Sequence, residues 1–119
     1  MGAFQKIFDD YGADYSVTME RFMGNEGMYF KFLNMLLEDQ SLKNLGAALA
    51  ASDYQGAFEA AHTLKGVAGN MGLTPLYNVV CEIVEPLRLR ERRDDYKALY
   101  QNIEEEFRKV EALRTALEK

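Results

Sequence analysis

The sequence predicts an all-α protein, folded as an antiparallel four-helix bundle with one or two short extra helices at its amino end. Its apolar residues recur at the spacing of amphipathic helices, and no segment alternates apolar and polar residues as a strand would. Only two prolines occur in the 119 residues. Long apolar-striped segments with short connections favour a bundle, and the length fits a single domain over residues 1–119.

Two short helices are predicted at the amino end. The first carries apolar residues at positions i, i+3, i+4 and i+7. These residues are Phe4, Ile7, Phe8 and Tyr11. Gly12 ends this helix, and a second is predicted from Ser16, acting as its N-cap, to Phe22. Gly24 and Asn25 then break the chain.

The first long helical segment follows Asn25, whose side chain can cap it. Its apolar pattern continues for about six turns, with a break expected near residues 39–41. The residues predicted to point inward are Tyr29, Phe32, Leu33, Leu36, Leu42, Leu45 and Leu49.

Asp53 is the predicted N-cap of the next helix, which runs to about Met71 with Gly72 as its C′ residue. Thr74 is predicted to cap the helix after it, with Pro75 at the first helical position. That helix buries an apolar face. The face consists of Leu76, Val79, Val80 and Ile83.

Pro86 cannot donate a backbone hydrogen bond, so the helix that contains it is predicted to end or kink near Glu85. The last helix is predicted to begin at Asp94 or Asp95. Its inward face is long and regular. The residues on it are Tyr96, Leu99, Tyr100, Ile103, Phe107, Val110, Leu113 and Leu117.

Composition excludes several classes of function. The net charge is −5, and an acidic chain without a basic cluster is a poor nucleic-acid binder. The one basic run, Arg88 to Arg93, is interrupted by Leu89 and Glu91 and is interpreted as a solvated helix end. No apolar run approaches the ~18–20 residues of a membrane span. The amino end lacks the features of a signal peptide, so we expect a cytoplasmic monomer.

Cys81 is the only cysteine, so no disulfide can form within the chain. Its neighbours Val80 and Ile83 favour a buried, inert thiol. One histidine and one cysteine are too few for a zinc site of the usual type.

The segment from His62 to Gly72 is the most informative part of the sequence. It holds the only histidine, a lysine three residues later, and glycines four, seven and ten residues later. On a helix of about 100° per residue, the apolar residues form one arc opposite the histidine. They are Ala57, Ala60, Ala61, Leu64, Val67, Ala68 and Met71. His62 is therefore predicted to lie outside the core.

Five residues share the side of His62 on this helix, and they are polar or small except for one aromatic residue. They are Gln55, Phe58, Lys65, Gly66 and Gly69. A glycine within a helix costs about 0.5–1 kcal/mol relative to alanine. We interpret Gly66 and Gly69 as keeping this face open, so that a partner's backbone can approach the imidazole; the alternative is that they allow tight helix packing. Phe58 is the predicted aromatic contact of this docking surface.

This arrangement suits a phosphoryl acceptor. Neutral imidazole is a nucleophile near neutral pH, because its reference pKa is about 6.5. Phosphoryl transfer needs in-line positioning and positive charge near the phosphoryl oxygens, part of which Lys65 can supply. The sequence contains neither type of glycine-rich ATP loop and no evident carboxylate cluster for Mg²⁺. We therefore expect no cofactor on the chain, and a partner must bring the phosphoryl group and the metal.

These residues resemble the motif of histidine-containing phosphotransfer (HPt) domains. The matching residues are His62, Leu64, Lys65, Gly66, Ala68, Gly69 and Gly72. The similarity extends over residues 46–53 and 57–61, downstream to about Leu76, and over residues 21–25, so that about two thirds of the chain fits.

The resemblance implies a helical bundle that takes a phosphoryl group from a receiver-domain aspartate and donates it to another receiver. It implies His62 as the phosphorylated residue and Lys65 as the stabilising charge. It also implies receiver domains or a hybrid sensor kinase as partners, with Mg²⁺ on the receiver. Many members present a polar residue to the histidine from the following helix, whereas this chain has Val84 where we expect that residue. The other candidates on that helix are Asn78, Glu82 and Glu85.

Three alternatives remain open. In the phosphoacceptor domain of a histidine kinase an acidic residue typically follows the histidine, whereas Thr63 follows it here. A helical-bundle adaptor would carry His62 incidentally. A hydrolase using His62 as a base would need a second catalytic group, and none lies at a fixed spacing.

Overall fold

The computed structural model describes residues 3–118, which contain seven helices and no strand. The helices are α1 (Ala3–Tyr11), α2 (Tyr15–Arg21), α3 (Glu26–Glu38), α4 (Ser41–Ala50), α5 (Tyr54–Asn70), α6 (Thr74–Arg88) and α7 (Tyr96–Leu117). The molecule is elongated, with principal extents of 48 × 22 × 20 Å. The predicted all-α class is confirmed.

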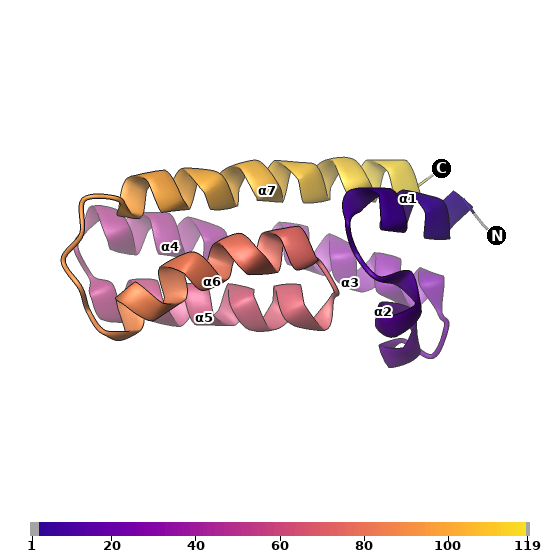
Figure 1. The fold of residues 1–119 in the computed structure, drawn as a ribbon, viewed down its shortest axis with the longest axis horizontal. Helices are drawn as coiled ribbons and strands as arrows, with labels where there is room; N and C mark the ends of the chain where they lie inside the picture. Colours follow the sequence, from indigo (N-terminus) through magenta and orange to yellow (C-terminus); the bar gives the residue numbers. More distant parts are fainter. Residues whose placement is uncertain (1–2, 119) are drawn as a thin grey trace.

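The four-helix bundle consists of α4, α5, α6 and α7 (Figure 1). Each helix packs against the next in sequence, and α7 closes the bundle against α4. Figure 1 also shows α7 extending beyond this bundle along the whole molecule, with α1, α2 and α3 gathered at its far end. The two short amino-terminal helices therefore cover one end of the bundle, as the sequence predicts.

The predicted break between α3 and α4 is confirmed. Helix α3 ends at Glu38, and α4 begins at Ser41. The Asp39 carboxylate accepts a hydrogen bond of 2.7 Å from the Ser41 backbone N–H, so it holds the turn between the two helices.

Two of the predicted N-caps are present. The Asn25 side-chain oxygen accepts a hydrogen bond of 2.9 Å from the Met28 N–H at the start of α3. The Asp53 carboxylate accepts one of 2.9 Å from the Gly56 N–H at the start of α5. Each cap satisfies a backbone donor that has no partner within its own helix.

Two other predicted starts are wrong by one or two residues. The N-cap of α2 is Asp14, which accepts a hydrogen bond of 3.1 Å from the Val17 N–H, so Ser16 lies within the first turn. Thr74 is the first residue of α6, and Leu73 is its N-cap without a side-chain hydrogen bond. In both cases the chain enters the helix one or two residues before the predicted cap. A Ser or Thr near the start of a helix does not by itself fix the residue at which the helix begins.

Pro86 lies inside α6, and of the two predicted outcomes, an end or a kink near Glu85, the end is wrong because the helix continues to Arg88. Pro86 and the following Leu87 are both buried in the core. Their packing stabilises the last turn and offsets the backbone hydrogen bond that the proline removes.

The predicted core face is largely correct, but Phe32 is 41% exposed. Helix α3 lies beyond the bundle, and the Phe32 ring contacts the Phe22 ring of the segment after α2, with centroids 5.9 Å apart. The aromatic core at this end is centred on Tyr29, which is fully buried. Its ring makes edge contacts with Phe8 at 5.2 Å and Phe22 at 5.1 Å, so these rings join α1 and α2 to α3.

Candidate functional site

The candidate site lies on α5, whose apolar arc is placed as the sequence predicts. The residues of the arc that are fully or almost fully buried are Ala57, Ala60, Ala61, Leu64, Ala68 and Met71, and Val67 is half-buried. His62 is exposed on the opposite side of the helix. The predicted position of His62 outside the core is therefore confirmed.

The imidazole of His62 has an aromatic neighbour one turn earlier on α5. Its ring centroid lies 5.5 Å from that of Phe58, and the two ring planes are inclined by 43°. Within residues 3–118, no hydrogen bond or ion pair involves the His62 side chain. Its ring nitrogens are thus accessible to a reactant approaching from solvent.

Arg88 of α6 lies on the ring of Phe58. The guanidinium carbon is 5.0 Å from the ring centroid, within the range of a cation–π interaction. The Arg88 Nε also pairs with Glu85 Oε1 at 3.3 Å. From the sequence, Arg88 is only part of a solvated helix end, because the register between α5 and α6, which brings it to Phe58, is not visible there.

Lys65 is half-buried on the turn that follows His62. In the described part of the chain it has no side-chain hydrogen bond or ion pair. Its amino group is therefore not held by a carboxylate and can approach a group bound to the imidazole.

The two glycines near His62 differ in their surroundings. A β-carbon on Gly66 would have no atom within 4 Å, so the predicted open space is present there. A β-carbon on Gly69 would lie 3.1 Å and 3.2 Å from two ring carbons of Tyr77. The predicted opening at Gly69 is therefore wrong, and tight packing between α5 and α6 explains this glycine.

The carboxyl end of α5 is held by residues distant in sequence. Gly72 has a φ of +68° and ends the helix as the predicted C′ residue. Arg21 Nη1 donates hydrogen bonds to the carbonyls of Gly69, at 2.9 Å, and Asn70, at 3.2 Å. The Tyr29 hydroxyl donates one of 2.7 Å to the Met71 carbonyl. Among the described residues, the Asn70 and Met71 carbonyls receive no backbone hydrogen bond, so these side chains satisfy them, whereas the Gly69 carbonyl also accepts one of 3.2 Å from the Gly72 N–H.

Val84 is fully buried in the core. This position of α6 therefore faces the bundle interior in this chain and does not present a side chain to the solvent face of α5. The polar candidates Asn78, Glu82 and Glu85 are exposed on α6.

An open cavity of about 380 Å³ adjoins the site between α3 and α5. Gly66 contributes to its wall, and the exposed side chains of Phe32 and Met35 are also part of it. The full lining consists of Phe22, Phe32, Met35, Leu36, Asp39, Gly66, Val67, Asn70 and Met71.

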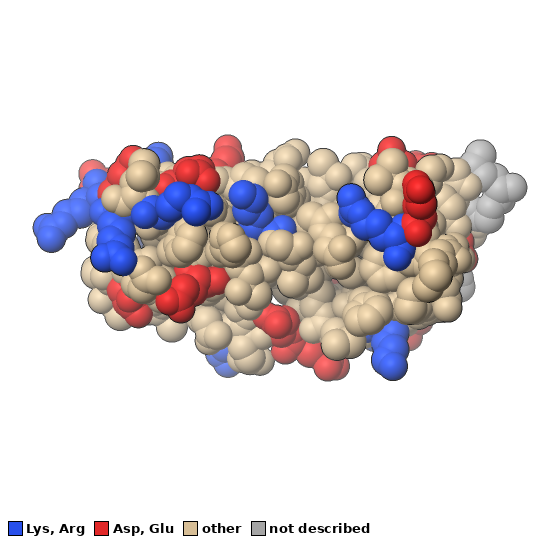
Figure 2. All heavy atoms as spheres, turned by 90° about the horizontal axis from the view of Figure 1, so that it is seen from below, with Lys and Arg blue, Asp and Glu red and all other residues tan. Residues whose placement is uncertain are grey.

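Charge is unevenly distributed on this side of the molecule. Figure 2 shows several Lys and Arg side chains at the end where the α6–α7 connection lies, with acidic side chains beside them, and fewer charged side chains of both signs along the middle. The sequence places Arg88, Arg90, Arg92 and Arg93 at this end. Arg90 donates a hydrogen bond of 2.6 Å to the Gln55 side chain of α5, so this connection lies against the first turns of α5.

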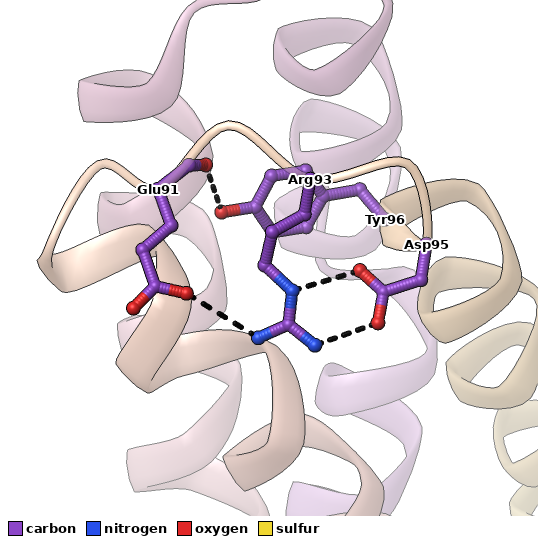
Figure 3. Close-up of polar contacts among 4 residues, drawn as sticks. All are labelled: Glu91, Arg93, Asp95 and Tyr96. Carbon is purple, nitrogen blue, oxygen red and sulfur yellow. Dashed lines mark hydrogen bonds and ion pairs between the residues drawn. The ribbon is translucent and has the colours of Figure 1, made fainter.

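Arg93 is engaged within the connection itself (Figure 3). Its guanidinium forms two hydrogen bonds with the Asp95 carboxylate, at 2.9 Å and 2.6 Å, and lies 3.5 Å from a carboxylate oxygen of Glu91. The Tyr96 hydroxyl donates a hydrogen bond of 2.6 Å to the Glu91 carbonyl. The hydrogen bonds from Arg93 hold the pKa of the Asp95 carboxyl below its usual value.

In the part of the chain that the structure describes, no three His, Cys, Asp or Glu side chains lie together in a group able to hold a metal ion. Over the same residues, no helix has the length and apolar character needed to cross a membrane.

Comparison with known proteins connects this geometry to a family. The family model described as "Hpt domain" matches residues 29–119. The crystal structure of histidine-containing phosphotransfer protein B (HptB) from Pseudomonas aeruginosa PAO1 is similar, with a TM-score of 0.77 and 31% sequence identity. The similarity covers 87% of this chain and 90% of that one. No curated protein sequence gives a significant match.

Proposed function

The chain belongs to the Hpt domain family and is a histidine phosphotransfer protein of a phosphorelay; from this premise, we propose that His62 is its phosphoacceptor. The donor in this proposal is the phosphorylated aspartate of one receiver domain, and the acceptor is the aspartate of another.

The exposed imidazole of His62 is the observation that supports the proposal most directly. It is the only imidazole in the chain, it lies within the matched region, and it faces solvent from a helix whose opposite side is buried. A packed structural histidine would be buried and hydrogen-bonded, which His62 is not.

The proposed reaction is a reversible displacement at phosphorus. A ring nitrogen of His62 attacks the phosphorus of the aspartyl phosphate, a P–N bond forms, and the P–O bond to the carboxylate breaks. The proton of the other ring nitrogen passes to solvent, which leaves a neutral imidazole ring with the negatively charged phosphoryl group on its nitrogen. Positive charge on Lys65 stabilises the phosphoryl oxygens as the bond changes. Passing the group to a second receiver reverses these steps.

Hpt domains interact with receiver domains and histidine kinases in phosphorelays, and this chain interacts with that class of partner. We propose further that it acts as a cytoplasmic monomer without autokinase activity and without a cofactor or nucleic acid of its own. Mg²⁺ in this proposal is bound by the receiver. Phe58 and Gly66 form the proposed docking surface around His62. Gly69 lets the Tyr77 ring of α6 pack closely against α5 next to this surface.

The test is phosphoryl transfer from a phosphorylated receiver domain. The chain is incubated with candidate phospho-receivers without ATP, and the phosphorylated residue is mapped by mass spectrometry. We expect an acid-labile, base-stable phosphate on His62 alone and none on a folded His62→Gln variant. Undiminished labelling of that variant refutes the assignment. A chain that binds receivers but takes up no phosphate from any of them is an adaptor, and labelling from ATP alone identifies a kinase activity.

A further inference from the structure

Arg88 is a positively charged residue of α6 that shares an aromatic neighbour with His62, the proposed phosphoacceptor on α5. The Phe58 ring contacts both groups: the imidazole centroid lies 5.5 Å from its centroid, and the Arg88 guanidinium carbon lies 5.0 Å from it. A residue on α6 and a residue on α5, 26 positions apart in the sequence, thus share one aromatic support.

The present partner of Arg88 holds it only weakly. Its Nε lies 3.3 Å from Glu85 Oε1, and the two side chains are 45% and 62% exposed. Exposed ion pairs of this kind contribute little to stability, because water competes for both charges. A phosphoryl dianion offers a guanidinium more negative charge and two oxygens in a geometry that suits its planar donors.

We propose that Arg88 exchanges Glu85 for the phosphoryl group once His62 is phosphorylated, and so stabilises the phosphohistidine. In the unphosphorylated protein Arg88 rests on Phe58 and neutralises Glu85. After transfer its guanidinium hydrogen-bonds to the phosphoryl oxygens, from the side of α6, while Lys65 approaches from α5. The inference rests on the proposed phosphorylation of His62.

The other arginines at this end of the molecule do not fit this role. Arg90 is bound to Gln55, and Arg93 is bound to Asp95 and Glu91. Arg92 is exposed and, over residues 3–118, forms no side-chain hydrogen bond or ion pair. It has the same charge and lies four residues after Arg88, in the connection between α6 and α7, so Arg92→Gln is the control for Arg88→Gln.

The experiment uses phosphoramidate, a small phosphodonor, so that phosphohistidine forms without any receiver. Nuclear magnetic resonance of the ¹⁵N-labelled full chain follows the arginine Nε–Hε signals before and after phosphorylation, and the Arg88→Gln spectrum identifies the Arg88 signal. We expect this signal to move in the wild-type chain and to stay in place in His62→Gln treated in the same way.

A ³¹P titration of the phosphohistidine supplies a second measurement. A bound guanidinium favours the dianion, so it lowers the pKa of the phosphoryl group. We expect Arg88→Gln to raise the titration midpoint by about half a pH unit, a threefold change in proton affinity, and Arg92→Gln to leave it unchanged. Three other charged residues near the site are the same in both variants: Glu59, Lys65 and Arg90. Glu85 loses its partner only in Arg88→Gln, so both arginine substitutions are also made in a Glu85→Gln background, where the same difference between them is expected.

The outcomes separate this inference from the proposed function. A moving Arg88 signal together with a raised midpoint only in Arg88→Gln supports it. An unmoved signal, or equal midpoints in Arg88→Gln and Arg92→Gln, refutes the role of Arg88 while His62 remains the phosphoacceptor. Absence of phosphate on His62 with both phosphoramidate and phospho-receivers refutes the proposed function and this inference together.

Discussion

The Tyr77 ring of α6 lies over Gly69 of α5, and its Cε1 atom is 3.1 Å from the point that a β-carbon on Gly69 would occupy. Gly66, one turn earlier, has open space at the same position. The two glycines therefore contribute differently: Gly69 lets the helices approach closely, and Gly66 leaves the surface beside His62 free.

Replacing Gly66 tests this distinction. Gly66→Leu should raise the free energy of unfolding by about 0.5–1 kcal/mol, because leucine is the better helix former and its β-carbon would have no atom within 4 Å. Its side chain should nevertheless slow transfer from a phospho-receiver, while phosphoramidate, which is small, should still react. Urea unfolding and both transfer rates are measured on the same variant. Equal slowing with both donors would mean that Gly66 shapes the histidine itself and not the docking surface.

Gly69→Ala is the companion variant. Its new methyl group requires the Tyr77 ring to shift by a few tenths of an ångström, so the gain in helix propensity should be partly or wholly lost. In a chain that already carries Tyr77→Ala, adding Gly69→Ala should give the full gain in the free energy of unfolding. If Gly69→Ala alone raises that free energy as much as Gly66→Ala does, the packing role of Gly69 is contradicted.

Gly72→Ala should be the most destabilising of the glycine substitutions. The residue has a φ of +68°, and its β-carbon would overlap the hydroxyl oxygen of Thr18, which is buried. We expect a loss above about 2 kcal/mol in urea unfolding, from backbone strain and overpacking together. Gly24→Ala is the control, since Gly24 has a φ of +72° but no neighbour within 4 Å, so it should lose only the strain, about 1–2 kcal/mol.

Lys65→Ala should slow transfer by about 10–100-fold if the ammonium group contributes about 1.4–2.8 kcal/mol to the transition state. Thermal stability should change by no more than about 0.5 kcal/mol, because no ion pair within the described residues is lost. Lys43→Ala, on the exposed side of α4, is the matched control and should transfer normally. A large loss of stability with normal transfer would assign Lys65 to the fold.

The Arg93–Asp95 pair makes stability depend on pH in a defined direction. Hydrogen bonds from Arg93 lower the pKa of Asp95 in the folded chain, so the stabilisation is present above the ordinary carboxyl pKa and is lost as pH falls through the lowered value. Wild type should therefore exceed Asp95→Asn in urea midpoint at about pH 7, and the two should converge at about pH 2. Asp94→Asn should show no such convergence, because Asp94 has no ion pair within residues 3–118.

The helices and the exposure of His62 could be predicted because they depend on local periodicity. An apolar arc of seven residues on α5 fixes which side faces the core, whatever the neighbouring helices are. The N-caps at Asn25 and Asp53 are local for the same reason, since each bond spans three residues.

The surroundings of the site could not be predicted, because they depend on the register between helices. Nothing near Gly69 in the sequence places Tyr77 over it, and nothing near His62 brings Arg88 to Phe58. The exposure of Phe32 has a similar cause: its spacing fits an inward face, but α3 extends past the bundle and has too few neighbours to cover it.

The hydrogen bonds from Arg21 and Tyr29 to the end of α5 have a practical consequence for protein engineering. The family match begins at residue 29, so a chain trimmed to that boundary would keep Tyr29 but lose α1, α2 and Arg21. The carbonyls of Gly69 and Asn70 would then lose their guanidinium donor, and the cavity beside the site would lose the wall that Phe22 provides. Anyone grafting this phosphoacceptor into a synthetic signalling protein should therefore carry the preceding residues along with the matched segment.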